Sequence, residues 1–200
     1  MRTGIFGGTF NPIHTGHLML AEQAYSSFVL DRVFFIPSGR SYFKDDIKMP
    51  DAAVRFEMCR LACEGNEHFH VLDTETKRPG NSYTCETLEE LKGMYPDDEF
   101  FYIAGFDSFA ELGHFKDPEK IFALSRIVVA ARNDGTDISA IKINYESKFG
   151  ARVDILDMPR IDISSSMIRQ YIKEGRSVRY YLPGRVEKYI MENGIYTESI

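Results

Sequence analysis

Residues 4–17, GIFGGTFNPIHTGH, decide how the rest of the chain folds. The run Arg2–Phe6 has the composition of a β-strand, and the Gly7-Gly8 pair ends it in a tight turn that leaves backbone N–H groups open to a ligand. Thr15 is then expected to cap the N-terminus of a helix. Because a helix N-terminus has partial positive charge and unpaired donors, this order of elements favours the binding of a phosphate group.

Two histidines stand at the start of this helix. His14 and His17 are three residues apart, so we expect both side chains to point to one side of the first turn. A histidine pair at this spacing is most often a capping or surface feature when it stands alone. Its position directly after a strand and a glycine turn favours the interpretation as a phosphate site.

Composition restricts the class of protein. The chain has 200 residues with 44% hydrophobic content, which suits one domain with a substantial core. A net charge of −6 argues against binding to polymeric nucleic acid, which requires a broad basic surface. The three cysteines form no CxxC pair, so reduced thiols in the cytoplasm are expected rather than a disulfide framework or a zinc site. No signal segment or membrane-spanning run is visible, and the oligomeric state stays open, a homo-oligomer included.

Apolar runs alternate with helical patterns along the chain. This alternation predicts strand–helix–strand units and an α/β fold with a parallel sheet. The expected strands after the first are 33–37, 68–72, 99–104, 126–131 and 152–156. The expected helices are 18–28, 51–64, 81–91, 117–124, 139–149 and one that starts near Ser164. Within the second helix we interpret Arg55 as a surface or salt-bridge arginine.

Polar residues follow the ends of several predicted strands, where open α/β sheets bind ligands. Lys44, in the polar loop 38–50, is either a phosphate contact or a solvated lysine. Gly105 and Asp107 follow the strand 99–104. The Asp107 carboxylate is suited to accept two ribose hydroxyls, and it is equally suited to cap the next helix.

Two hydroxyl-rich segments open later helices. Thr84 and Thr87 lie in the first turns of the segment SYTCETLEEL, where they either satisfy open helix donors or contact a ligand. The segment Ile163–Arg169, ISSSMIR, places three serine hydroxyls and a guanidinium at one helix start. A serine run is usually a capping feature, but with an arginine one turn later it is typical of a phosphate site.

These motifs together resemble those of the HxGH nucleotidyltransferases. The signature is HTGH, residues 14–17, preceded by GTFNP, residues 8–12, and the GGTFNP form resembles the nicotinate-nucleotide adenylyltransferase branch. The string SYTxxTLxxL, the GxD at residues 105–107 and ISSSMIR resemble that branch as well. The resemblance covers the chain from the first strand to Tyr196 and implies a Rossmann-like, three-layer fold. It has a parallel sheet of five or six strands with helices on both faces and a helical C-terminal segment, 161–200, all in one nucleotidyltransferase domain, 1–200.

The resemblance implies transfer of an adenylyl group from ATP to nicotinate mononucleotide, which gives deamido-NAD and pyrophosphate, with Mg²⁺ carried by ATP. Catalytic roles are implied for His14, His17 and Arg169. Contacts with ATP are implied for Gly7, Gly8, Thr9, Phe10, Lys44, Gly105, Asp107, Arg132, Ser164, Ser165 and Ser166. Contacts with the mononucleotide are implied for Thr84, Thr87 and Phe115.

Two departures from the family pattern leave the substrate open. The family loop that reads PPHK keeps only its lysine here, as Lys44. Phe115 stands where the family has a tryptophan that stacks on the pyridine ring, so the base can be nicotinate or nicotinamide. The alternatives are a phosphopantetheine adenylyltransferase and a nucleotide-binding protein without catalysis.

Overall fold

The computed structural model describes residues 1–41, 49–130, 138–159 and 161–197. Two of the predicted site residues, Lys44 and Arg132, lie outside these ranges. The strands are β1 Arg2–Gly8, β2 Arg32–Pro37, β3 Arg40–Ser41, β4 Phe69–Val71, β5 Asn81–Ser82, β6 Glu99–Ala104, β7 Ser125–Ala130 and β8 Val153–Leu156. The helices are α1 Thr15–Ser27, α2 Ala52–Cys63, α3 Thr84–Met94, α4 Phe106–Glu111, α5 Pro118–Leu124, α6 Ile138–Phe149, α7 Ser165–Lys173 and α8 Gly184–Glu192, with a short 3₁₀ turn η1, Leu112–His114.

Six strands form one parallel sheet in the order β4-β2-β1-β6-β7-β8. Gly4 of β1 lies opposite Val33 of β2 on one side and Phe101 of β6 on the other. Strand order therefore reverses between β1 and β6, and such a switch point opens a crevice at the carboxyl ends of the two strands. The predicted Rossmann-like α/β fold is confirmed, and its sheet has six strands.

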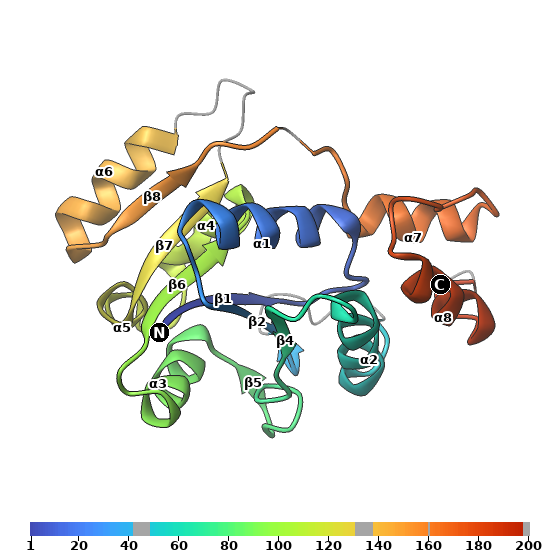
Figure 1. The fold of residues 1–200 in the computed structure, drawn as a ribbon, viewed down its shortest axis with the longest axis horizontal. Helices are drawn as coiled ribbons and strands as arrows, with labels where there is room; N and C mark the ends of the chain where they lie inside the picture. The colour runs from blue at the N-terminus through green and yellow to red at the C-terminus, as the bar shows by residue number, and fades with distance from the viewer. Residues whose placement is uncertain (42–48, 131–137, 160, 198–200) are drawn as a thin grey trace.

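Two hydrophobic layers cover the sheet because side chains alternate between its faces. Phe6 and Phe35 pack into a core with α1, α2, α7 and α8. Their neighbours Ile5 and Phe34 pack into the opposite core with α3, α4, α5 and α6. Figure 1 shows α1 on one side of β1 and α3 on the other. The result is a three-layer arrangement that holds the ends of β1 and β6 rigidly.

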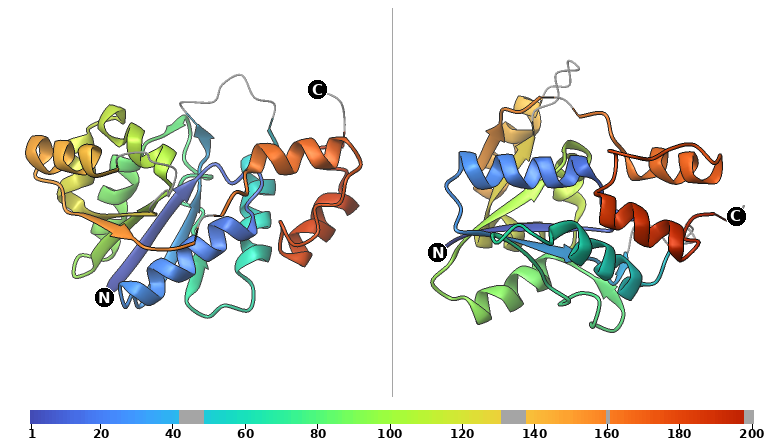
Figure 2. Two further views of the ribbon diagram at one scale, coloured as in Figure 1. Left: turned by 90° about the horizontal axis from the view of Figure 1, so that it is seen from above. Right: turned by 45° about the vertical axis from the view of Figure 1, so that its right-hand side comes forward.

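The C-terminal helices α7 and α8 lie side by side at the end of the molecule opposite the N-terminus, in all the views of Figures 1 and 2. Their buried residues, which include Ile168, Ile172, Val186 and Ile190, join the core under α1 and α2. This packing brings the ISSSMIR segment next to the start of α1. None of the helices that the structure describes combines the length and apolar composition that a membrane span requires.

Several local details differ from the sequence-based expectation. Helix α1 begins at Thr15, with His14 rather than Thr15 as its N-cap. Gly105, not Asp107, is the N-cap of α4, so the Asp107 carboxylate belongs to the first helical turn. The three cysteines are free and buried, which confirms the prediction that they form no disulfide.

Candidate functional site

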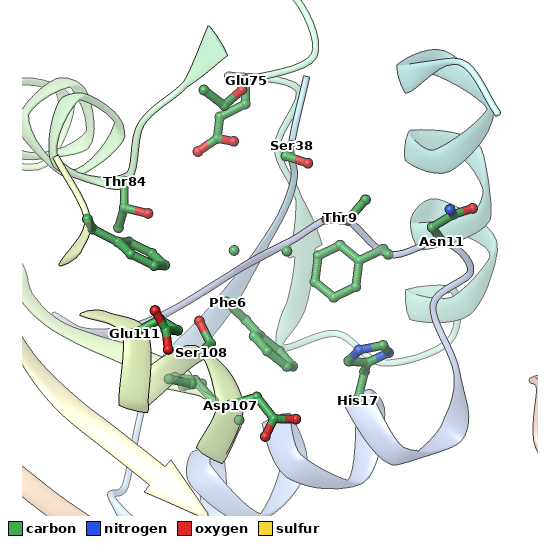
Figure 3. Close-up of a pocket in the computed structure, with 18 of the residues that line it drawn as sticks. Phe6, Thr9, Asn11, His17, Ser38, Glu75, Thr84, Asp107, Ser108 and Glu111 are labelled. Atoms are coloured by element: carbon green, nitrogen blue, oxygen red, sulfur yellow. The ribbon is translucent and has the colours of Figure 1, made fainter. Parts of the chain in front are cut away.

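A cavity of about 950 Å³ opens where β1 and β6 end. Side chains from β1, α1, α3 and α4 surround it, as Figure 3 shows. The cavity lies at the switch point of the sheet, where ligands bind in open α/β folds. It brings together these predicted site residues: Gly7, Gly8, Thr9, Phe10, His17, Thr84, Gly105, Asp107, Phe115, Ser165 and Arg169.

The two histidines of the HTGH motif have different environments. His17 lines the cavity, whereas His14 is buried behind it with its ring stacked on that of His17 at a centroid distance of 3.6 Å. The backbone N–H of His14 donates to Nδ1 of His17 at 3.1 Å. In a neutral imidazole the hydrogen of His17 therefore resides on Nε2. Of the two histidines of this motif, the structure therefore brings only His17 to the cavity wall.

Burial fixes the charge state of His14. It lowers the pKa of His14 from 6.5 to about 4, and the buried Nδ1 has no hydrogen-bond partner among the described residues. The ring is therefore neutral at pH 7 and contributes no positive charge. Gly16 permits this position, because a Cβ at residue 16 would lie 3.1 Å from His14 Nδ1. Direct contact of His14 with a phosphate stays a prediction.

The buried His14 predicts a stability change in mild acid. The unfolded chain takes up a proton at this residue near pH 6.5, and the folded chain does so only near pH 4. The contribution of His14 to the free energy of unfolding should therefore fall by about 3 kcal/mol as the pH drops through this interval, and by nothing further below it. Urea unfolding between pH 7.5 and pH 4 measures the change.

The control for this measurement is His14→Asn, because asparagine is a good N-cap that does not titrate. Carboxylates that also titrate in this range are common to both proteins. The difference between the two pH profiles therefore isolates His14. Parallel profiles for His14→Asn and the unmodified protein would contradict the assigned neutral state.

The turn after β1 is held by donors from distant parts of the chain. Ser165 Oγ donates to the carbonyl of Pro12 at 2.8 Å, and Nη1 of Arg169 donates to the carbonyl of Asn11 at 2.7 Å. Tyr196 Oη donates to Oδ1 of Asn11 at 2.7 Å. The C-terminal segment therefore contacts the turn after β1 directly. The expectation that Gly7-Gly8 forms this turn is wrong, because both glycines continue β1 and pair with β2.

Three other predicted residues do not line the cavity. Ser164 is the N-cap of α7 and accepts a hydrogen bond from the Met167 N–H, and Ser166 is exposed with its Oγ 3.1 Å from that of Ser164. Thr87 is buried and donates to Oε1 of Glu75 at 2.7 Å. The capping interpretation holds for Ser164. Thr87 does not line the cavity itself, but it is hydrogen-bonded to Glu75, which does.

Comparison with known proteins shows the family of the chain. A family model described as cytidylyltransferase-like matches residues 5–171. The chain belongs to the cytidylyltransferase-like family. It is 42% identical over 197 residues to a protein of Lachnoclostridium phytofermentans named "Probable nicotinate-nucleotide adenylyltransferase", with 98% of each chain covered. A protein of Geobacter sulfurreducens with the same name is 42% identical over 215 residues, with 100% of each chain covered.

Solved structures show the same fold. The nicotinic acid mononucleotide adenylyltransferase of Plasmodium falciparum complexed with NaAD matches with a TM-score of 0.81 and 17% identity, over 98% of this chain and 97% of that one. The complex of the same protein with APC matches with a TM-score of 0.79. This cytidylyltransferase-like chain therefore shares the arrangement of strands and helices of a nucleotidyltransferase.

Sequence reasoning missed several residues of the site in this family member. Glu75 and Tyr102 line the cavity, and burial raises the pKa of both. For Tyr102 the pKa rises to about 12, while side-chain hydrogen bonds with Thr84 and Ser108 oppose the rise. Tyr102 lies among buried apolar residues of strand β6, so the sequence pattern does not distinguish it from a core residue. Arg55, interpreted from the sequence as a surface or salt-bridge arginine, is 1% exposed, so the surface position is wrong.

The described residues hold no group of three or more His, Cys, Asp or Glu side chains close enough to bind a metal ion. Carboxylates do line the cavity singly, from Asp107, Glu111 and Glu75. Mg²⁺ keeps most of its ligands as water and phosphate oxygens in nucleotide sites. Single carboxylates of this kind are compatible with a cation whose other ligands are water and phosphate oxygens.

Proposed function

We propose that this protein transfers the adenylyl group of ATP to nicotinate mononucleotide, which gives deamido-NAD and pyrophosphate in NAD biosynthesis. The single observation that carries the proposal is that His17 and Arg169, from opposite ends of the chain, line one cavity at the switch point of the sheet. Full-length relatives named for this activity support the choice of substrate.

The nucleophile in this reaction is the 5′-phosphate of the mononucleotide. It is already anionic, so the protein needs neither a general base nor a covalent intermediate. One oxygen of this phosphate attacks the α-phosphorus of ATP, and the bond from that phosphorus to the β-phosphate oxygen breaks. The protein contributes alignment of the two substrates and stabilisation of the negative charge that develops.

His17 is the proposed donor to the α-phosphate. Its Nδ1 accepts a hydrogen bond from the His14 backbone, which directs the N–H of Nε2 away from the helix N-terminus. The stacked ring of His14 restricts rotation of the His17 ring. Under this proposal His14 orients His17, and direct contact of His14 with the phosphate is the alternative.

The β- and γ-phosphates are assigned to the start of α7. Arg169 and Ser165 line the cavity there, and a guanidinium next to a helix N-terminus is a strong site for phosphate. We assign Lys44, Ser164 and Ser166 to the same phosphates. Mg²⁺ is proposed to enter as part of the ATP substrate, bridging its phosphates.

The mononucleotide is assigned to the opposite part of the cavity. Thr84 at the start of α3 and Phe115 after η1 are proposed to contact the pyridine ring, with Thr87 supporting that wall. Gly105 and Asp107 are proposed to contact the ribose of the nucleotide, and Arg132 to lie near it. The Phe115 ring offers a π face, although a smaller one than tryptophan.

The same proposal covers the organisation of the protein. Helices α7 and α8 share a hydrophobic core with α1 and α2, which supports one nucleotidyltransferase domain over residues 1–200. The free, buried cysteines support a cytoplasmic location. The partners are ATP and a pyridine mononucleotide, with no polymeric nucleic acid and no membrane. Assembly into a homo-oligomer is open.

A steady-state assay of pyrophosphate release tests this function. ATP and Mg²⁺ are supplied with nicotinate mononucleotide, nicotinamide mononucleotide or 4′-phosphopantetheine, in parallel reactions. The highest kcat/KM is expected with the nicotinate substrate. A higher value with the amide would change the substrate and keep the reaction, and turnover of phosphopantetheine would move the protein to another branch. ATP binding without any pyrophosphate release would identify a protein without catalysis.

A further inference from the structure

The guanidinium of Arg55 is one of the largest fully buried side chains of the described residues, and it lies behind the phosphate end of the cavity. Arg55 belongs to α2, and its donors contact three backbone carbonyls. Nε donates to Pro50 at 3.2 Å, Nη1 to Thr9 at 2.8 Å and Nη2 to Gly39 at 2.7 Å. These three residues belong to three separate segments. One side chain thus joins the turn after β1 to the chain on both sides of residues 42–48.

Burial of this charge opposes folding. Desolvation lowers the pKa of Arg55, but arginine keeps its proton in proteins, so the charge is present at pH 7. A buried cation costs several kcal/mol, and an apolar side chain of similar volume often serves stability better. The contacts with three carbonyls therefore indicate a role for Arg55 beyond filling space in the core.

The contact with Thr9 fixes the direction of a backbone donor. The C=O and N–H of a trans peptide point in opposite directions, so a Thr9 carbonyl held by Arg55 turns the N–H of Phe10 to the other side. Both Thr9 and Phe10 line the cavity. A charged donor on the carbonyl also polarises the peptide and makes its N–H a stronger donor.

Gly39 gives Arg55 a rigid support on its other side. The Gly39 N–H donates to Oγ of Ser82 at 3.0 Å, and its backbone packs directly on Glu75. A Cβ at residue 39 would lie 2.3 Å from the carbonyl oxygen of Glu75, so only glycine fits here without movement of the backbone. Ser38, Thr9 and Glu75 are visible around this part of the cavity in Figure 3. Arg55 therefore connects the turn to a fixed point of the fold.

We propose that Arg55 is a positioning residue for ATP: it holds the Thr9–Phe10 peptide with its N–H toward the phosphates, and its buried charge strengthens that donor. The inference rests on the proposed function and adds a residue that touches neither substrate. It predicts that loss of Arg55 changes the kinetic parameters for ATP and leaves those for the mononucleotide unchanged.

The test compares Arg55→Met and Arg55→Lys with Arg32→Met. Methionine keeps much of the volume without charge or donors, and lysine keeps the charge without the planar fork. Arg32 is a matched control, because it is a half-buried arginine at the start of β2, bonded to Asp98 and Thr3 at the end of the sheet away from the cavity. Urea unfolding and active-fraction measurements correct each rate for the folded population.

We expect Arg55→Met to lower kcat/KM for ATP by about 10²-fold, the cost of displacing a reacting group by about 1 Å, with KM for the mononucleotide within about twofold of normal. Arg55→Lys should recover part of this loss, and Arg32→Met should lose stability only. Equal loss on both substrates, or kcat/KM for ATP within about twofold of normal in both Arg55 variants, would overturn the inference.

Two further measurements keep the test decisive. If Arg55→Met does not fold, Arg55→Lys is compared with Arg32→Met instead. The quantities compared are again kcat/KM for ATP and KM for the mononucleotide. If the unmodified protein turns over neither pyridine mononucleotide, the proposed function fails. Calorimetric titration with ATP and Mg²⁺ then tests Arg55 by itself, and weaker ATP binding by the Arg55 variants than by Arg32→Met is the expected result.

Discussion

His17→Ala is expected to lower kcat by about 10²–10³-fold, the usual cost of losing one well-placed donor to the transition state. KM for both substrates should change little, because the contact strengthens as charge develops on the α-phosphate. The structure supports this expectation by placing the His17 ring on the cavity wall. The hydrogen bond from the His14 backbone to Nδ1 leaves the ring hydrogen of neutral His17 on Nε2.

Two amide variants locate the donor on the ring. The side-chain amide of glutamine can reach the position of Nε2, and that of asparagine reaches only the position of Nδ1. His17→Gln should therefore recover more of the lost turnover than His17→Asn, which keeps the acceptor for the His14 N–H. Equal turnover in these two variants would contradict the assignment of Nε2–H as the donor.

His68→Ala is the matched control for loss of a histidine. His68 is half-buried and stacks on Tyr25 at a centroid distance of 4.4 Å, and it is not among the residues that line the cavity. It should keep normal turnover while showing what loss of one stacked imidazole does to stability. Near-normal kcat in His17→Ala, with the fold verified by near-ultraviolet circular dichroism, would remove His17 from the mechanism.

The fold could be predicted because its strands are long apolar runs with clear ends. The strand 99–104 has the predicted bounds, since charged residues precede it and Gly105 follows it. The site could be predicted in outline because its motifs follow strands, and the carboxyl ends of parallel strands meet at one edge of a sheet. Periodicity and turn chemistry therefore determine where the cavity lies.

Side-chain direction within the motifs could not be predicted in the same way. His14 and His17 do lie on one side of the first turn, with their rings stacked, as expected. His14 is the N-cap, however, with an extended backbone at φ −143° and ψ 170°, and only His17 lines the cavity. Ser164 is likewise a cap, and its hydroxyl is bonded to the helix. Residues at the junction between turn and helix follow the geometry of the cap instead.

The role of Arg55 had no signal in the sequence for a different reason. Its described partners are backbone carbonyls of Thr9, Gly39 and Pro50, and a carbonyl is present at every position of every chain. Spacing along α2 therefore contains no information about these contacts. They exist only because the sheet brings the ends of β1 and β2 to the start of α2.

Arg169→Met is expected to lower kcat/KM for ATP by about 10²-fold or more, because a charged hydrogen bond is worth about 1.5–3 kcal/mol and the guanidinium is proposed to bind two phosphates. Nη1 of Arg169 also holds the carbonyl of Asn11 at 2.7 Å. The variant therefore loses both the proposed ligand contact and support for the turn after β1. Arg169→Lys should restore the charge but not the paired contacts.

The reverse reaction separates Arg169 from His17. Deamido-NAD and pyrophosphate are supplied, and the formation of ATP is measured. If Arg169 binds the β- and γ-phosphates, Arg169→Met raises KM for pyrophosphate and leaves KM for deamido-NAD nearly unchanged, whereas His17→Ala lowers kcat in both directions. Arg176→Met is the control, since Arg176 stacks on Tyr171 just after α7 and is not among the residues that line the cavity. An unchanged KM for pyrophosphate in Arg169→Met would separate Arg169 from the leaving group and limit it to holding the turn.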